Sequence, residues 1–107
     1  MTDIQAIAVS TTTGNLEEAQ RIAREIVELK LAACAQIFPI ESIYHWQGEV
    51  HNDPEFKILF KTTAANYDAL EQAIIKRHSY DLPEIYAIAL THISAPYAEW
   101  ISANTMP

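Results

Sequence analysis

The stretch from Cys34 to Thr63 most constrains the fold, because it has the pattern of one long β-hairpin. Gln47 and Gly48 mark its tip, since tight hairpin turns need positive φ angles that glycine adopts freely. Counting outward from this tip pairs Trp46 with Glu49, His45 with Val50, and Tyr44 with His51. Each arm then exceeds about ten residues, which is long for a strand. A small chain cannot cover such arms by itself, so the sequence predicts that other copies of the same chain cover them.

Length and composition predict a single domain over residues 1–107. Half of the residues are hydrophobic and 20% are charged, which supplies a core and argues against disorder. The formal net charge is -7. An acidic surface repels phosphate backbones, so no nucleic-acid partner is expected.

The N-terminal segment and the lone cysteine bear on the compartment. The first ten residues carry an acid and no basic residue before a short apolar run, unlike a secretory signal. No apolar run approaches the ~20 residues that span a bilayer. Cys34 has no second cysteine with which to form an internal disulfide, which fits a reducing compartment. We therefore expect a cytoplasmic protein with no membrane partner.

Hydrophobic periodicity predicts four strands and three helices. The expected strands cover residues 4–11, 32–46, 49–63 and 85–93. One helix is expected from the capping residue Asn15 to the cation Lys30, a second over 63–78, and a short third from Pro96. Because proline removes a ladder donor, Pro39 is expected to bend the second strand. For the same reason, the outer half of the third strand is expected to be irregular around 52–54.

The element order β-α-β-β-α-β plus a terminal helix predicts an α+β fold of the ferredoxin-like, split βαβ class. Both long helices then cover one side of an antiparallel sheet and leave the other side open. Apolar side chains such as Tyr86, Ile88 and Leu90 or their neighbours reach the open side. An exposed apolar sheet face predicts association with further copies.

Four histidines are the first candidates for metal ligands: His45, His51, His78 and His92. The predicted hairpin register sends His45 and His51 to opposite faces, and no histidine or cysteine spacing typical of a metal site is present. His78 is the best candidate, because it ends a helix beside a polar connector. The alternative for each histidine is an ordinary surface or hydrogen-bonded role.

Cys34 and Lys61 are the other candidates for a reactive or ligand-binding side chain. Cys34 lies in an apolar alternation, typical of a small buried hydrophobe, and nothing in the sequence lowers its thiol pKa as a nucleophile requires. Lys61 lies on the less apolar face of the third strand, and Glu84 is a possible carboxylate partner. Such a pair would be structural, or would bind a polar ligand in a cleft between copies.

Four strings resemble the CutA family, the divalent-cation tolerance proteins: KLAAC, SIY-x-W-x-G, a strand that ends in KT, and H-x-Y-x-x-PE. They occur in family order and, with a closing PYAEWI, extend the resemblance over essentially the whole chain. The resemblance implies a ferredoxin-like protomer in a tight homotrimer, whose long hairpin packs across neighbouring subunits. It also implies a cytoplasmic, non-enzymatic protein linked to metal tolerance, and a trimer similar to PII-type signalling proteins.

The resemblance also implies site residues. Copper ligands assigned in some members match Thr11, Arg77 and His78 here, and only His78 keeps a ligand side chain. Direct copper binding is therefore expected to be weak, with His78 as the metal residue and no other cofactor. Lys61, Tyr80, Pro83 and Glu84 match the family pattern better. We expect Lys61, Tyr80, Glu84 and Trp46 to line an intersubunit cleft that takes a small ligand.

Three functions remain open from the sequence. The first is a trimeric tolerance or signalling protein with weak binding of a divalent cation. The second is an enzyme that uses intersubunit clefts, with Lys61 and Glu84 as electrostatic or acid–base groups. The third is a structural trimer with no ligand of its own.

Overall fold

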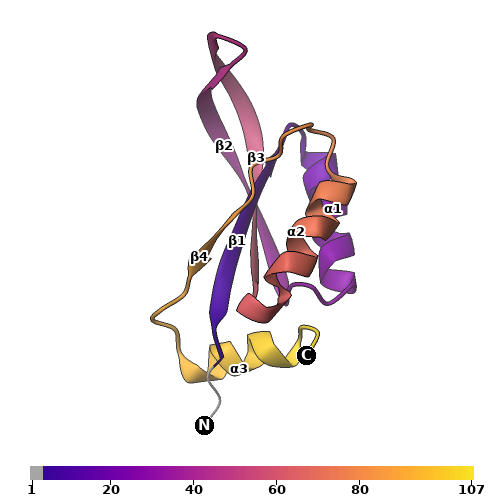
Figure 1. Ribbon diagram of the computed structural model, residues 1–107, viewed down its shortest axis with the longest axis vertical. Coiled ribbons are helices and arrows are strands. Elements are labelled where there is room, and N and C mark those ends of the chain that lie inside the picture. The colour runs from indigo at the N-terminus through magenta and orange to yellow at the C-terminus, as the bar shows by residue number, and fades with distance from the viewer. Residues whose placement is uncertain (1–3) are drawn as a thin grey trace.

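The computed structural model describes residues 4–107 and shows one four-stranded sheet with two helices on one side and a third across its lower end (Figure 1). The strands are β1 (Ala6–Thr13), β2 (Cys34–Trp46), β3 (Glu49–Thr63) and β4 (Tyr86–Ala89). All neighbouring strands are antiparallel, in the order β2-β3-β1-β4. The helices are α1 (Leu16–Glu28), α2 (Tyr67–Arg77) and α3 (Ala95–Ala103), with a short 3-10 turn (Ala64–Asn66) before α2. None of the helices in residues 4–107 is long and apolar enough to cross a membrane.

The core lies between α1, α2 and the two central strands. Val9 of β1 and Phe60 of β3 are fully buried and face each other in the register. Ile22 and Ile26 of α1 and the α2 residues Leu70 and Ile74 cover them from the helical side and are also fully buried. The three- and four-residue spacing on each helix and the two-residue spacing on each strand place these side chains on one layer. The sheet is therefore tightly covered on this side.

The other side of the sheet carries no helix along most of its length, as expected from the element order. Tyr86 and Ile88 of β4 lie on this open face and are 41% and 53% exposed. Two cations of β3 share the face, since Lys57 donates a hydrogen bond to the Tyr86 hydroxyl (3.3 Å) and Lys61 donates one to Gln36 Oε1 (2.6 Å). The open face is thus apolar on β4 and carries two positive charges, Lys57 and Lys61, on β3.

The predicted hairpin register is confirmed. Trp46 pairs with Glu49 across the tip, and one unbroken register continues down to Cys34 and Lys61. Gln47 and Gly48 have φ angles of 51° and 81°, the positive values that the tight turn requires. The hairpin extends well beyond the helices (Figure 1), and the molecule measures 50 × 25 × 21 Å. Its radius of gyration of 14.5 Å exceeds the ~13 Å of a compact chain of this length.

The irregularity expected around residues 52–54 of β3 was wrong, because the strand is continuous there. Pro39 pairs with Phe56 and Pro54 with Glu41 inside continuous strands, and no bulge interrupts the register. Pairs in a two-residue hairpin alternate between hydrogen-bonded and non-hydrogen-bonded, starting with a bonded pair next to the turn. Counted from Trp46 and Glu49, both prolines fall in non-bonded pairs. Their nitrogens therefore point away from the partner strand, to sides where no further strand is paired.

Two strand boundaries also differ from the prediction. β1 begins and ends two residues later than expected, because its pairing with β3 starts at Ala6 and continues to Thr13. β4 covers 86–89 rather than 85–93: its paired register with β1 ends at Ile7–Ala89, and one further hydrogen bond, from the Leu90 N–H to the Ala6 carbonyl oxygen (3.0 Å), follows. The second helix starts as a 3-10 turn, since Thr63 is still paired in the sheet. The length of each strand is thus set by the strand with which it pairs more than by its own residue composition.

Candidate functional site

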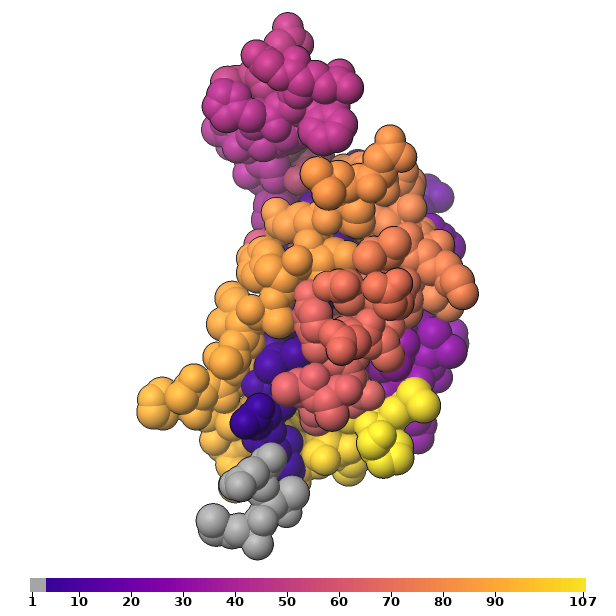
Figure 2. All heavy atoms as spheres, in the orientation of Figure 1, coloured from indigo at the N-terminus to yellow at the C-terminus, as the bar shows by residue number. Residues whose placement is uncertain are grey.

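A groove of about 690 Å³ lies where the hairpin leaves the body of the molecule. Its aromatic lining consists of Tyr44 and Trp46 from β2 and Tyr80 from the connector between α2 and β4. Its acidic lining consists of Glu41, Glu55, Asp81 and Glu84. We call this cavity, with these seven residues, the hairpin groove. In Figure 2 the hairpin stands above the body, and the segment that follows α2 lies below it.

Tyr80 is fixed at the floor of the hairpin groove by three neighbours. Its hydroxyl donates a hydrogen bond to Glu55 Oε2 (2.8 Å), and its ring lies 4.8 Å from the ring of His78. Gly14 leaves room for it, because a Cβ at that position would come within 3.1 Å of the Tyr80 hydroxyl. Burial raises the pKa of Tyr80 well above its usual value, and the hydrogen bond to Glu55 raises it further. Tyr80 is therefore a neutral donor at ordinary pH.

The connector that carries Tyr80 is held by the first turn of α1. Asn15 caps the helix by accepting a hydrogen bond from the Glu18 N–H (2.8 Å). The buried Glu18 carboxylate then accepts two hydrogen bonds from Ser79, one from its backbone N–H (2.8 Å) and one from its hydroxyl (2.9 Å). A helix N-terminus favours a negative charge at this place. Glu18 thus ties the wall of the hairpin groove to the core.

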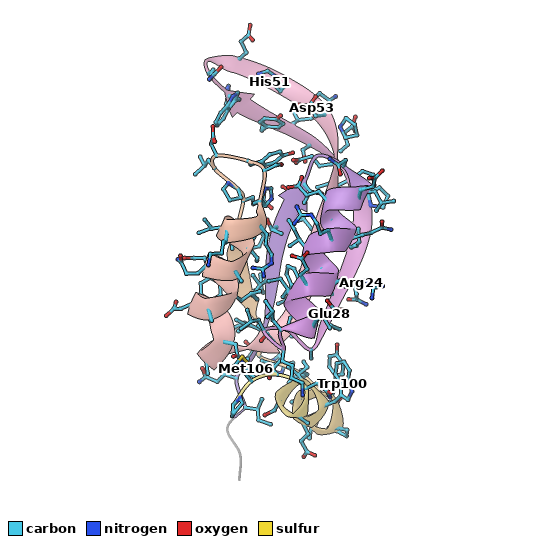
Figure 3. The ribbon with its side chains drawn as sticks, turned by 90° about the vertical axis from the view of Figure 1, so that its right-hand side faces the viewer. Arg24, Glu28, His51, Asp53, Trp100 and Met106 are labelled. Atoms are coloured by element: carbon cyan, nitrogen blue, oxygen red, sulfur yellow. The ribbon has the colours of Figure 1, made fainter. Side chains whose placement is uncertain are left out.

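The hairpin wall has its own internal contacts. The Tyr44 hydroxyl donates a 2.6 Å hydrogen bond to Asp53, and the Tyr44 ring stacks on His51 at 5.6 Å. Figure 3 shows His51 and Asp53 together on the hairpin, away from the helices. The hydrogen bond to Asp53 raises the pKa of Tyr44, with a smaller contribution from burial. These contacts orient Tyr44 beside the hairpin groove.

Three of the four predicted cleft residues come together in the hairpin groove: Trp46, Tyr80 and Glu84. Lys61 does not join them, because it pairs with Ala8 and Cys34 at the opposite end of the sheet. Its amine contacts Gln36 instead, and within residues 4–107 no ion pair joins it to Glu84. Lys61 and Glu84 therefore do not pair within one copy, and a pair between copies stays a prediction.

His78 is a structural histidine in this conformation. Its side chain is fully buried, and Nδ1 accepts a hydrogen bond from the Tyr80 N–H (3.1 Å). Nε2 lies 2.8 Å from the Thr12 carbonyl oxygen, so this nitrogen carries the proton and donates. Neither ring nitrogen has a free lone pair for a metal. The expected role of His78 as a metal ligand therefore does not fit the geometry.

The two other positions matched to copper ligands fit no better. Thr11 is fully buried in the sheet, and Arg77 donates a 2.9 Å hydrogen bond to Glu25. A threonine hydroxyl and a guanidinium are unsuited to copper. The described part of the chain contains no group of three histidine, cysteine or acidic side chains that could hold a metal ion.

Several residues of the hairpin groove were missed by sequence reasoning. Glu41, Glu55 and Asp81 look like ordinary surface acids, and only the fold brings them to one cavity. Glu18 did carry a signal, since Asn15 and Glu18 have the spacing of a helix capping box. Its real partner, Ser79, is distant in sequence and could not be read from that signal.

Comparisons with known proteins agree on one family. Residues 7–104 match the family model described as CutA1 divalent ion tolerance protein. The divalent-cation tolerance protein CutA of Thermus thermophilus is 40% identical over 98 residues, which cover 91% of this chain and 95% of that protein. The chloroplastic protein CutA of Arabidopsis thaliana is 38% identical over 95% of this chain. The chain spans 57% of that plant protein and 59% of its rice counterpart.

Solved structures give the same result. The crystal structure of CutA1 from Oryza sativa has a TM-score of 0.93 and 38% identity, with 96% of this chain and 95% of that chain covered. A CutA structure from Archaeoglobus fulgidus, named as periplasmic, has a TM-score of 0.90 and 34% identity, with 92% and 97% covered. The family is named for tolerance of ions and not for a reaction, and its members' names mention the chloroplast and the periplasm. The chain belongs to the CutA1 divalent ion tolerance protein family.

Proposed function

We propose that this chain is a non-enzymatic, cytoplasmic protein of divalent-cation tolerance that works as a ferredoxin-like homotrimer. Family membership supports the tolerance role, and the strand order with both long helices on one side supports the fold class. The free thiol of Cys34 fits a reducing compartment.

The exposed surface of the single chain is the observation that carries the trimer. The chain exposes 6871 Å², whereas a monomer of its 12.0 kDa mass exposes about 6000 Å². Large apolar side chains are exposed on the projecting hairpin and the open face, where Ile43 and Val50 are 67% and 65% exposed and Ile88 is 53% exposed. Large exposed apolar patches mark association sites. Two separate patches on one copy suit head-to-tail contacts, which close into a ring when the rotation allows.

Light scattering tests the trimer. We expect a mass three times the 12.0 kDa of one chain. Ile88→Lys places a third cation beside Lys57 and Lys61 on the open face and should lower the mass. Ile75→Lys is the matched control, because Ile75 is 47% exposed on α2, outside the open face. A monomeric wild-type protein, or equal behaviour of the two variants, contradicts the proposal.

Binding of divalent cations is proposed to be weak and to occur at exposed carboxylates of the acidic chain, not at His78. Two observations support this proposal: both ring nitrogens of His78 are already hydrogen-bonded, and the chain has a formal net charge of -7. Calorimetric titration with copper and zinc should give small heats that fall with added salt, because diffuse charge is screened. His78→Asn should leave those heats unchanged. Absence of heat with any divalent ion removes metal binding from the proposal.

The hairpin groove favours a second function, the binding of a small ligand by the trimer. Its volume lies in the range of small-molecule sites, and it holds three of the four cleft residues expected from the sequence. This function is independent of the metal titration. It needs only that the hairpin groove stays open in the assembled protein.

A further inference from the structure

We propose that the hairpin groove binds an organic cation, an extended alkylamine with two or more ammonium groups. This inference rests on the small-ligand function proposed above and adds the chemical class of the ligand. Four features carry it: the size of the groove, the single sign of its charge, the aromatic rings in its wall, and the placement of its carboxylates on two segments.

The charge of the hairpin groove is uncompensated. None of its lining residues is a lysine, arginine or histidine. Within residues 4–107, Glu41, Asp81 and Glu84 make no ion pair and no side-chain hydrogen bond. Glu55 accepts only from the neutral Tyr80 hydroxyl. Low-dielectric walls around charges of one sign concentrate counterions in a cleft.

The aromatic wall favours an ammonium group over a bare metal ion. Tyr44 and Trp46 are 40% and 44% exposed beside the carboxylates, so both side chains are accessible to a ligand, although one face of the Tyr44 ring stacks on His51. A cation over such a face gains about 0.5–2 kcal/mol, most with tryptophan. Leu82 also lines the groove and is 75% exposed. It offers apolar contact to methylene groups, which an inorganic cation does not have.

The placement of the carboxylates on two different segments points to an extended ligand. The described residues hold no cluster of three ligand side chains close enough for one metal ion. Glu41 belongs to the hairpin, whereas Asp81 and Glu84 belong to the connector on the other side of the groove. Carboxylates on two walls match ammonium groups that are separated by a short alkyl chain.

Isothermal titration calorimetry on the assembled protein tests the proposal, with spermidine and putrescine as probes at fixed ionic strength. We expect saturable binding, tighter for spermidine. Trp46→Leu and Glu84→Gln should each weaken it roughly tenfold. Glu28→Gln is the control for net charge, because Glu28 is exposed on α1, away from the hairpin (Figure 3). It should keep wild-type affinity.

A fluorescence measurement supplies a local readout. The chain has two tryptophans, so Trp100→Phe leaves Trp46 as the sole reporter. Spermidine should change its emission with the affinity found by calorimetry.

Four results overturn the proposal: no saturable binding of either amine, equal weakening by Glu28→Gln, full competition by magnesium at equal charge concentration, or a Trp46 emission that spermidine leaves unchanged. A protein that binds neither amine can still be a trimer that gives heats with divalent metal ions. That result would contradict only the proposed class of ligand, not the proposed function. A monomeric mass with intact amine binding would instead remove the trimer.

Discussion

Replacing Glu18 by alanine should loosen the connector that builds one wall of the hairpin groove. The buried carboxylate accepts two hydrogen bonds from Ser79, at 2.8 and 2.9 Å. Hydrogen bonds to a charged group contribute about 1.5–3 kcal/mol each, and two on one carboxylate are not additive, so the loss should be about 2–4 kcal/mol. For a domain of this size that lowers the melting temperature by about 10–25 °C.

The matched control for this change is Glu17→Ala. Glu17 lies next to Glu18 in the first turn of α1 and is exposed, so its removal costs only the helix-end charge effect of about 0.3–1 kcal/mol. Glu18→Gln should fall between the two, because its amide keeps one acceptor for the Ser79 N–H and can donate to the hydroxyl. Thermal unfolding by circular dichroism measures all three at one protein concentration, since association adds stability by mass action. Equal melting temperatures for Glu18→Ala and Glu17→Ala would refute this reasoning.

Three further predictions concern backbone strain and titration. Lys30→Gly should raise the free energy of unfolding by about 1 kcal/mol, because Lys30 has a φ of 60°; Lys30→Ala should not, and chemical denaturation compares the two. Gly14→Ala should lower the melting temperature, because its Cβ would come within 3.1 Å of the Tyr80 hydroxyl, and Tyr80→Phe in the same background should restore part of the loss. If the double variant is no more stable than Gly14→Ala, the close approach is not the cause. The raised pKa of Tyr80 means that the folded state favours the neutral phenol, so its contribution is present below the usual tyrosine pKa and is lost as pH rises through the folded value. Ultraviolet titration of wild type should show a late-ionising tyrosine that Tyr80→Phe removes, and an unchanged curve would contradict the assignment.

The sequence predicted local geometry well where the pattern itself decides it. The register across Gln47 and Gly48 followed from one glycine and a period of two, and the cap at Asn15 followed from its position before an amphipathic helix. The effect of Pro54 was misjudged although the needed information was present. Counting the same register outward from the tip places Pro39 and Pro54 at positions that donate nothing to the partner strand.

The candidate site was only partly predictable, because its contacts join segments that are distant in sequence. Trp46, Tyr80 and Glu84 were expected in one cleft and do line one groove, but that expectation came from family resemblance. The hydrogen bond between His78 and the Thr12 carbonyl spans 66 positions, and no periodicity encodes it. Within one copy Lys61 contacts Gln36 and lies away from Glu84, because side-chain type alone does not give the level of a residue along a sheet.

The prolines of the hairpin bear on how an unassembled copy avoids fibril growth. β2 is an outermost strand of 13 residues, and a bare strand of that length is a template for further strands. Pro39 stands near its middle, at a position where the nitrogen points outward. An incoming strand therefore meets two short runs of donors in place of one long run, while the unbroken inner ladder keeps the hairpin itself intact. Pro39 thus limits the addition of further strands to β2 and leaves the native pairing of β2 with β3 unchanged.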